Sequence, residues 1–395
     1  MGQLSHFFIF CTFRHPSVSI PRNCTSSIRH ARVFMQQGIF NGMGKHVRHA
    51  TEPIDPNATV QLGHGAGGRM TSELIDLLLE GVMYKNLEGG IGTLELDDGG
   101  AIPVPGSNSL VVITSDGHTV DPLVFPGGNL GKLSACGTIN DVLMLGAKPV
   151  AMTHVMILEE GIPFKLVQMI NESFVSVLNQ QEVALIAGDT KVMPHGTVSG
   201  CISATTGIGI VKETGIILDS GVQPGDEIVV SGTLGDHEIA LLASREGLGF
   251  ETELVSDVEV LDKVAGAGLE EGAHAMKDPT RGGLATTLNE FALKSQVSIW
   301  IEESSIPFKD TTVNACQMLG LNPFELASEG RAVIAVPKGH GDALVGKINQ
   351  IHPNTGAAVI GRARSDHAGK VLLKTSIGGT RVVRTPIGEP IPRVC

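Results

Sequence analysis

Aromatic side chains are scarce in this chain, which has one Trp and one Tyr among 395 residues. Proteins that bind nucleic acids by base stacking need such rings. The net charge of −12 is a second argument, because an acidic body repels the phosphate backbone. We therefore expect no nucleic-acid partner, and a bound nucleotide would need metal ions and backbone N–H groups around its phosphates.

The cysteines lack the spacings of a metal or redox site. The six are Cys11, Cys24, Cys136, Cys201, Cys316 and Cys395. No pair has C-x-x-C spacing, so neither a zinc ribbon nor a thioredoxin-type site is predicted, and nothing resembles a disulfide framework. Long apolar runs are missing too, since FFIFCTF near the start is far too short to span a bilayer. We expect a cytoplasmic protein without a membrane partner.

Acidic residues are absent from the first 50 positions, which hold six basic residues. The remainder has 23 basic and 41 acidic residues, a balance of −18. Residues 1–56 also lack a hydrophobic period, so we expect a disordered, dispensable extension. Its composition is typical of an organellar import sequence, and a start codon assigned too early would give the same pattern. The folded body is expected to begin near Val60.

Hydrophobic periodicity predicts an α+β chain of two domains. Helices are expected at 71–83, 131–149, 163–181, 285–295 and 311–321. Strands are expected at 109–117, at 228–232 and at 182–193, the last ending in a polar turn. Because the stretch 211–227 is rich in Gly, Pro and Asp, we place the boundary there. The expected parts are a first domain at 57–212, a second at 213–382 and a tail at 383–395.

The stretch GHGAGGR, Gly63 to Arg69, directly precedes the first expected helix. Glycines let the backbone approach a ligand, and helix N-termini favour phosphate. The stretch is neither a Walker A motif nor G-x-G-x-x-G, and an ordinary loop before a helix is the alternative. We take Gly65, Gly67 and Gly68 as candidate phosphate-binding positions.

Carboxylates beside glycines follow several expected strands. Each alone is more often a turn former than a ligand. Together they indicate a magnesium–nucleotide site, because Mg²⁺ prefers oxygen ligands and usually bridges phosphates. The clusters supply Asp97 and Asp98; Asp116, His118 and Asp121; Asn140 and Asp141; Asp189 and Lys191; Asp236 and His237; Asp278 and Arg281.

Lys132 after PGGNLG and Glu329 in LASEGR could act near phosphates as charge stabiliser and general base. A solvated helix face and a helix-end charge are the alternatives.

The C-terminus, TPIGEPIPRVC, has a proline density that excludes a helix or a central strand, so we expect an extended arm. That arm either ends in Cys395 by chance or carries this thiol into an active site.

Taken together, these segments resemble the HypE family of hydrogenase maturation factors, in the PurM-like (AIR synthetase-like) superfamily. The resemblance runs from about Val60 to Cys395. The motifs that carry it are HGAGGR, TSDGHTVDPLVFPGGNLGKLSACGTINDV, LEEGIP, AGDTKVM, SGTLGDH, DPTRGG, ASEGR and the terminal PRVC.

The resemblance implies two α+β domains, with the first dimerising through its sheet and ATP in a cleft between domains. It implies that Cys395 is carbamoylated by the carbamoyltransferase HypF and that the carboxamide is dehydrated to an S-cyanide with ATP. The cyanide would then pass to iron on a HypC–HypD complex, for [NiFe] hydrogenase. The expected catalytic residues are Cys395, Lys132, Glu329 and His118. The expected nucleotide ligands are Gly65, Gly67, Gly68, Asp116, Asn140, Asp189, Lys191 and Arg281. The expected Mg²⁺ ligands are Asp98, Asp116, Asp189 and Asp278.

One position departs from the family pattern, because Glu238 stands after GDH where a glycine is expected. Two alternatives stay open. One is a sibling enzyme of the selenophosphate synthetase or thiamine-phosphate kinase type, although Val60–Met70 lacks the reactive Cys of selenophosphate synthetases. The other is a scaffold that binds nucleotide without turning it over.

Overall fold

The computed structural model describes residues 54–55, 57–245, 252–353 and 355–388. The predictions made for residues 1–53 and for Cys395 therefore lie outside the described residues. Within the described part, no helix is long and apolar enough to cross a membrane.

The first domain is built on a five-stranded sheet in the order β1-β2-β7-β5-β6. Only β5 and β6 pair in parallel; the other neighbours are antiparallel. The strands are β1 Gly100–Pro103, β2 Ser109–His118, β5 Lys148–Glu159, β6 Ala184–Met193 and β7 Cys201–Lys212. A short ribbon, β3 Val124–Phe125 with β4 Gly128–Asn129, precedes the main helix.

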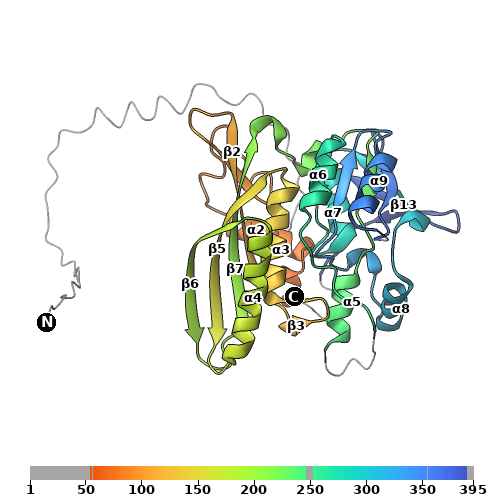
Figure 1. Ribbon diagram of the computed structural model, residues 1–395. Coiled ribbons are helices and arrows are strands. Elements are labelled where there is room, and N and C mark those ends of the chain that lie inside the picture. Colours follow the sequence, from red (N-terminus) through yellow and green to blue (C-terminus); the bar gives the residue numbers. More distant parts are fainter. Residues whose placement is uncertain (1–53, 56, 246–251, 354, 389–395) are drawn as a thin grey trace, which may run out of the picture. The chain divides into compact units, whose positions relative to one another are not determined.

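Helices α3, Leu130–Met144, and α4, Phe164–Gln180, cover one face of this sheet (Figure 1). Asn129 caps α3 by accepting hydrogen bonds from the N–H groups of Gly131 and Lys132. The helix packs directly on β7, because Cβ atoms added at Gly207 and Gly209 would lie 2.8 and 2.3 Å from α3 side chains. This close approach fixes the helix over the sheet.

The second domain has a seven-stranded sheet in the order β14-β13-β10-β12-β8-β11-β9. Its strands are β8 Glu227–Val230, β9 Ala275–Lys277, β10 Ser298–Glu302, β11 Val333–Val336, β12 Ala358–Arg364, β13 Lys370–Lys374 and β14 Thr380–Val383. Helix α7, Gly283–Ser295, packs on β10 and β13, whereas α9, Gly341–Ile351, packs on α6, Asp262–Glu270, and on β8 and β12. The remaining helices are α2 Arg69–Leu78, α5 Asp236–Ala243 and α8 Asp310–Leu319.

One hydrophobic core joins the two domains. Leu130 of α3 and Phe174 of α4 belong to the same buried cluster as Ile239 and Leu241 of α5. Burying a side chain of this size contributes about 1.5–3 kcal/mol. Because α3 packs into both domains, it fixes one wall of any site between them.

The two-domain α+β architecture is confirmed, and the helices expected at 163–181, 285–295 and 311–321 form. The helix expected at 131–149 ends earlier, since Gly146 at φ +73° follows it and β5 begins at Lys148. The strand expected at 182–193 forms as β6, and its polar turn follows Met193 and does not lie at the Gly-Asp step. Strand β6 continues through Asp189 and Lys191 to Met193, because parallel pairing with β5 overrides the local Gly-Asp turn signal.

Candidate active site

A cavity of about 160 Å³ lies where the end of β2 and helix α3 meet the loop after β9. From the first domain its lining includes Asp116, His118 and Asp141, and from the second Asp278, Arg281 and Glu329. Leu133, Gly137 and Asp141 are spaced by four residues, so one face of α3 forms a wall. The cavity is therefore lined by two domains and is strongly acidic.

The carboxyl groups around this cavity act on one another. Burial, and then the charges of Asp116 and Asp278, raise the pKa of Asp141 well above its usual range. Burial, and then Asp98 and Glu329, do the same to the pKa of Asp278. Among the cavity-lining residues that the structure describes, Arg281 is the one Lys or Arg. Positive charge from a ligand would thus be strongly favoured here.

Hydrogen bonds orient two of these carboxylates and leave a third open. Asp116 accepts a hydrogen bond from the Thr138 hydroxyl at 2.7 Å, and Asp141 accepts one from the Thr114 hydroxyl at 2.8 Å. The Oδ2 atom of Asp278 is buried and has no partner among the described residues. A buried acceptor without a partner indicates that a ligand completes the site.

His118 also faces the cavity. Its Nδ1 atom is buried without a partner in the described chain, and burial lowers the pKa of the ring to about 4. The imidazole is therefore neutral at pH 7, so it can exchange a proton but adds no positive charge.

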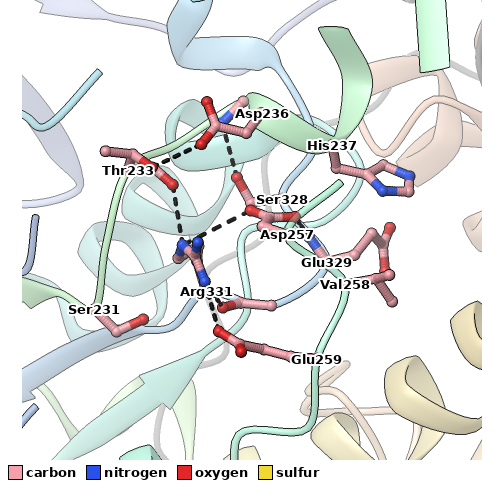
Figure 2. A network of polar contacts seen from close by, with 12 residues as sticks. Ser231, Thr233, Asp236, His237, Asp257, Val258, Glu259, Ser328, Glu329 and Arg331 are labelled. Carbon is pink, nitrogen blue, oxygen red and sulfur yellow. Dashed lines mark hydrogen bonds and ion pairs between the residues drawn. The ribbon is translucent and has the colours of Figure 1, made fainter. Parts of the chain in front are cut away.

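Glu329 is positioned through its backbone, as Figure 2 shows. Its N–H donates to the Asp257 carboxylate at 2.9 Å. Arg331 holds the same segment, donating to the Glu259 carboxylate at 2.7 Å and to the Thr233 carbonyl at 3.1 Å. Burial and the nearby Asp257 raise the pKa of Glu329 to about 8. The residue combines a fixed position with a raised pKa, as a general base requires.

The unexpected Glu238 serves the same loop. It is buried, and its carboxylate accepts a hydrogen bond from the N–H of Ala327 at 2.7 Å, two residues before Glu329. The departure from the family pattern therefore supports the loop that carries Glu329. Asp236 and His237 are fully buried and do not line the cavity.

Asn140 lies beside the cavity with another task. Its side chain donates to the Glu259 carbonyl at 3.0 Å and accepts from the Leu261 N–H at 2.9 Å. Its side chain thus connects α3 with residues 259–261, and its expected role as a nucleotide ligand stays a prediction. Its neighbour Asp141 lines the cavity and was not selected as a site residue. Its spacing of four from Leu133 and Gly137 places it on the cavity-facing side of α3, which only the structure shows.

Asp98 is engaged in a buried ion-pair network next to the cavity. It pairs with Lys277, which also contacts Asp219 at 3.2 Å, while Lys294 contacts Asp219 at 2.6 Å. Burial raises the pKa of Asp98 to about 6. Burial would also raise the pKa of Asp219, but the two lysines hold it at about 2. Lys277 occupies one of the two carboxylate oxygens of Asp98, and the predicted role of Asp98 as a metal ligand stays a prediction.

Two predicted residues lie on the far strand of the sheet. Asp189 and Lys191 are exposed on β6, separated from β2 by β7 and β5. Three strand spacings amount to roughly 14 Å, so neither residue reaches the cavity of its own chain. The role predicted for them as nucleotide or metal ligands stays a prediction.

Lys132 is half-buried on α3, one turn before Cys136. Its amine donates to the Gly127 carbonyl at 3.1 Å. Both Lys132 and Glu329 act electrostatically on Cys136, so these two residues flank the same part of the helix. Lys132 is not among the cavity-lining residues.

The glycine loop adjoins the cavity through Arg281. The guanidinium donates to the Gly65 carbonyl at 3.1 Å, and a Cβ at Gly67 would lie 2.5 Å from the Arg281 carbonyl oxygen. Gly68 faces the carbonyl of Pro386. The loop thus packs against protein atoms at the three predicted phosphate-binding positions.

The donor set suits a metal bridged by phosphate. Among the described residues, no group of three or more His, Cys, Asp or Glu side chains could hold a metal ion alone. Mg²⁺ usually takes one or two carboxylates and completes its shell with phosphate oxygens and water. One or two of the carboxylates Asp116, Asp141 and the unpartnered Asp278 would fit that arrangement, with phosphate and water as the other ligands.

Comparisons with known proteins agree with this architecture. The AIR synthase related protein family matches twice, with its N-terminal domain at residues 96–211 and its C-terminal domain at 223–374. A putative hydrogenase expression/formation protein of Methanocaldococcus jannaschii is 45% identical over 84% of this chain and 98% of its own. Carbamoyl dehydratase HypE of Rhizobium leguminosarum bv. viciae is 40% identical over 86% of this chain and 96% of its own.

Solved structures give the same result. A HypE–HypF complex matches with a TM-score of 0.72 and 32% identity, covering 79% of this chain and 99% of that one. A HypE structure in complex with ATP matches with a TM-score of 0.68 and 36% identity, covering 85% of this chain and 100% of that one. The chain therefore belongs to the HypE carbamoyl dehydratase family of AIR synthase-related proteins.

Proposed function

We propose that this protein uses ATP to dehydrate an S-carbamoyl group on Cys395 to an S-cyanide, which supplies the cyanide ligand of [NiFe] hydrogenase. The observation that carries the proposal is the acidic cavity between the domains, with Glu329 held at its edge at a pKa of about 8. Membership of the HypE family supports it.

The reaction needs a leaving group and a base. The carboxamide oxygen leaves poorly, so it attacks the γ-phosphorus of ATP and releases ADP. A base then removes the two N–H protons while the C–O bond breaks, and phosphate departs with the carboxamide oxygen. The product is S–C≡N, and the tail is lighter by one water. Glu329 is the base that the geometry favours, with Lys132 as charge stabiliser and His118 as a neutral proton relay.

Nucleotide binding is assigned to the cavity. One or two of Asp116, Asp141 and Asp278 would hold Mg²⁺ together with phosphate oxygens, and the ion would offset the charge of the phosphates when bound. Arg281 would contact a phosphate directly, because a guanidinium matches phosphate geometry. Asp98 would join the metal ligands through Oδ2, because Lys277 contacts its Oδ1 atom.

Three partners follow from the family. HypF would carbamoylate Cys395, and a HypC–HypD complex would accept the cyanide. A second copy would bind the first domain through its sheet, whose open face exposes Ile113 on β2 and Ile210 on β7. Such an apolar surface is typical of an interface. We place these steps in the cytoplasm, where thiols stay reduced.

Mass spectrometry of the C-terminal peptide tests the proposal. After carbamoylation by HypF with ¹⁸O in the carbamoyl group, adding Mg–ATP should remove one water from the peptide. The ¹⁸O should appear in inorganic phosphate. Loss of water from the peptide without ATP would contradict the mechanism, and so would release of the ¹⁸O into solvent water.

A further inference from the structure

The first turn of helix α2 is capped by a distant part of the chain. Gly68 stands at the N-cap and offers no side chain. The N–H of Arg69 donates to the Pro386 carbonyl at 2.9 Å, and the N–H of Met70 donates to the Ile387 carbonyl at 3.3 Å. The first N–H groups of a helix have no partner within it. Here the segment Pro386–Gly388, at the start of the C-terminal arm, supplies these partners.

The glycines of this loop are shaped to that segment. A Cβ at Gly68 would lie 2.4 Å from the Pro386 carbonyl oxygen, too close for any side chain. A Cβ at Gly63 would lie 2.9 Å from Met70 Sδ and 3.5 Å from the Cα of Gly388. The absence of a side chain at Gly68 is therefore required by the arm, whereas the space at Gly63 is limited mainly by the Met70 side chain.

The same loop is fixed to the wall of the cavity. Arg281, which lines the cavity, donates to the Gly65 carbonyl, and the Thr286 hydroxyl donates to the Gly67 carbonyl at 3.3 Å. One face of the loop thus holds the arm while the other contacts Arg281.

We propose that the loop Gly63–Met70 is a docking cradle for Pro386–Gly388 that positions the arm for the dehydration step. This inference rests on the proposed function, because it assigns a place to the arm whose last residue reacts. The loop then serves the carbamoylated substrate instead of the nucleotide phosphates.

Tether length alone would make docking a small effect. Twelve residues separate Val383, the end of β14, from Cys395, and seven separate Gly388 from Cys395. Seven extended residues reach at most roughly 25 Å. Shortening the tether from twelve to seven residues raises the effective concentration of its end by roughly twofold. If docking changes the dehydration rate by more than twofold, the further change would have to come from fixing where the arm starts and the direction in which it leaves the body.

The test uses the full-length chain with Gly68→Ala, which places a methyl group against Pro386. Gly266→Ala is the matched control, because its Cβ would have no neighbour within 4 Å. Wild type and both variants are carbamoylated, and ATP-dependent water loss is followed on the terminal peptide. We expect Gly68→Ala to slow that step by more than twofold, with Mg–ATP affinity unchanged by calorimetry. A rate within twofold of wild type, or an affinity weakened tenfold as a phosphate-binding loop requires, would overturn the cradle.

Hydrogen exchange separates this inference from the proposed function. The amides of Arg69 and Met70 should exchange faster in Gly68→Ala than in wild type, and equal exchange would refute docking. Absence of water loss in wild type would instead refute the proposed function, and the exchange rates would still decide docking. If Gly68→Ala does not fold, Met70→Ala serves, because the Met70 sulfur lies 3.4 Å from where a Cβ at Gly388 would stand and Ala is a good helix former.

Discussion

Glu329 owes its proposed role to its surroundings. A buried carboxyl with few compensating hydrogen bonds is neutral at pH 7, and Asp257 beside it strengthens that effect. The sequence indicated Glu329 through the motif ASEGR. It gave no sign of Asp257, which lies 72 positions away in the chain and meets Glu329 only after folding.

The pH profile should report this carboxyl. A base acts when deprotonated, so a pKa raised to about 8 means that activity rises with pH and levels off above pH 8. We expect this rise in the second-order rate constant for ATP, which reports the free enzyme. Glu329→Gln should remove the rise and lower the rate by about 10² or more. Glu302→Gln, at an exposed ion pair, is the control; a rise that persists in Glu329→Gln would assign the pKa elsewhere.

Asp141 shows why neighbouring residues could not be ranked from sequence. Asn140 and Asp141 are adjacent in TINDV, and both suit a nucleotide site chemically. A helix turns about 100° per residue, so one of them must face the second domain while the other faces the cavity. Which one does so depends on how α3 sits over its sheet.

Asp141→Asn should weaken Mg–ATP binding about tenfold or more, because it removes a charge from the acidic wall and keeps the side-chain shape. Calorimetric titration with Mg–ATP measures the effect. Asp121→Asn is the matched control. Asp121 follows β2, the strand that ends at the cavity, but it does not line the cavity. Equal affinities for the two variants would exclude Asp141 from the metal site.

At the scale of elements, the segment 256–261 forms hydrogen bonds to both domains. The N–H of Ser256 donates to the Pro126 carbonyl at 2.8 Å, its hydroxyl bonds His237 Nδ1 of α5 at 2.7 Å, and Leu261 bonds Asn140. Periodicity found α4 and α7 because their spacing is local. It missed the contacts of residues 256–261, because they depend on pairing with distant parts of the chain.

His237, which bonds Ser256 of this segment, makes the stability of the protein sensitive to acid. Burial lowers the pKa of its ring to about 3, below the ordinary 6.5. The unfolded chain therefore binds a proton that the folded chain excludes, so the stability present above pH 6.5 is lost as pH falls towards 3. By pH 5 the loss from this residue is about 2 kcal/mol.

Denaturant titrations at pH 7 and pH 5 measure that loss. The fall in the free energy of unfolding between the two pH values should be smaller in His237→Gln than in wild type by about 2 kcal/mol. His195→Gln is the control for removing a histidine outside the core, because its side chain is 86% exposed. Parallel pH curves for wild type and His237→Gln would refute this account.

At the scale of the whole molecule, the two domains and the family followed from motifs that span the chain. The carboxylates chosen from sequence met only in part: Asp116 and Asp278 share the cavity, Asp98 pairs with Lys277 and Asp189 lies on β6. Strand order decides this, and order is not visible in a local pattern. The hydrogen bond between Arg69 and Pro386 joins residues that are more than 300 positions apart, so no local motif could predict it.

The described thiols are poor candidates for the reaction, which sharpens the prediction for Cys395. Cys136, Cys201 and Cys316 are buried, and burial raises the pKa of their thiols to about 12, 11 and 11. A thiolate is the nucleophile, so these three are inert at neutral pH. Carbamoylation should therefore occur on none of them.

Cys395→Ala should abolish the carbamoyl and cyano products and leave Mg–ATP affinity unchanged. Its free energy of unfolding should change by less than about 0.5 kcal/mol, as for a surface substitution. One residue added after Cys395 should be nearly as harmful as removing the thiol, if the site is shaped for a terminal residue. Cys316→Ala is the control for thiol number, and it should keep both mass changes at the terminal peptide. Cyanide delivery by Cys395→Ala, or water loss on Cys136, would show that the arm does not carry the reacting sulfur.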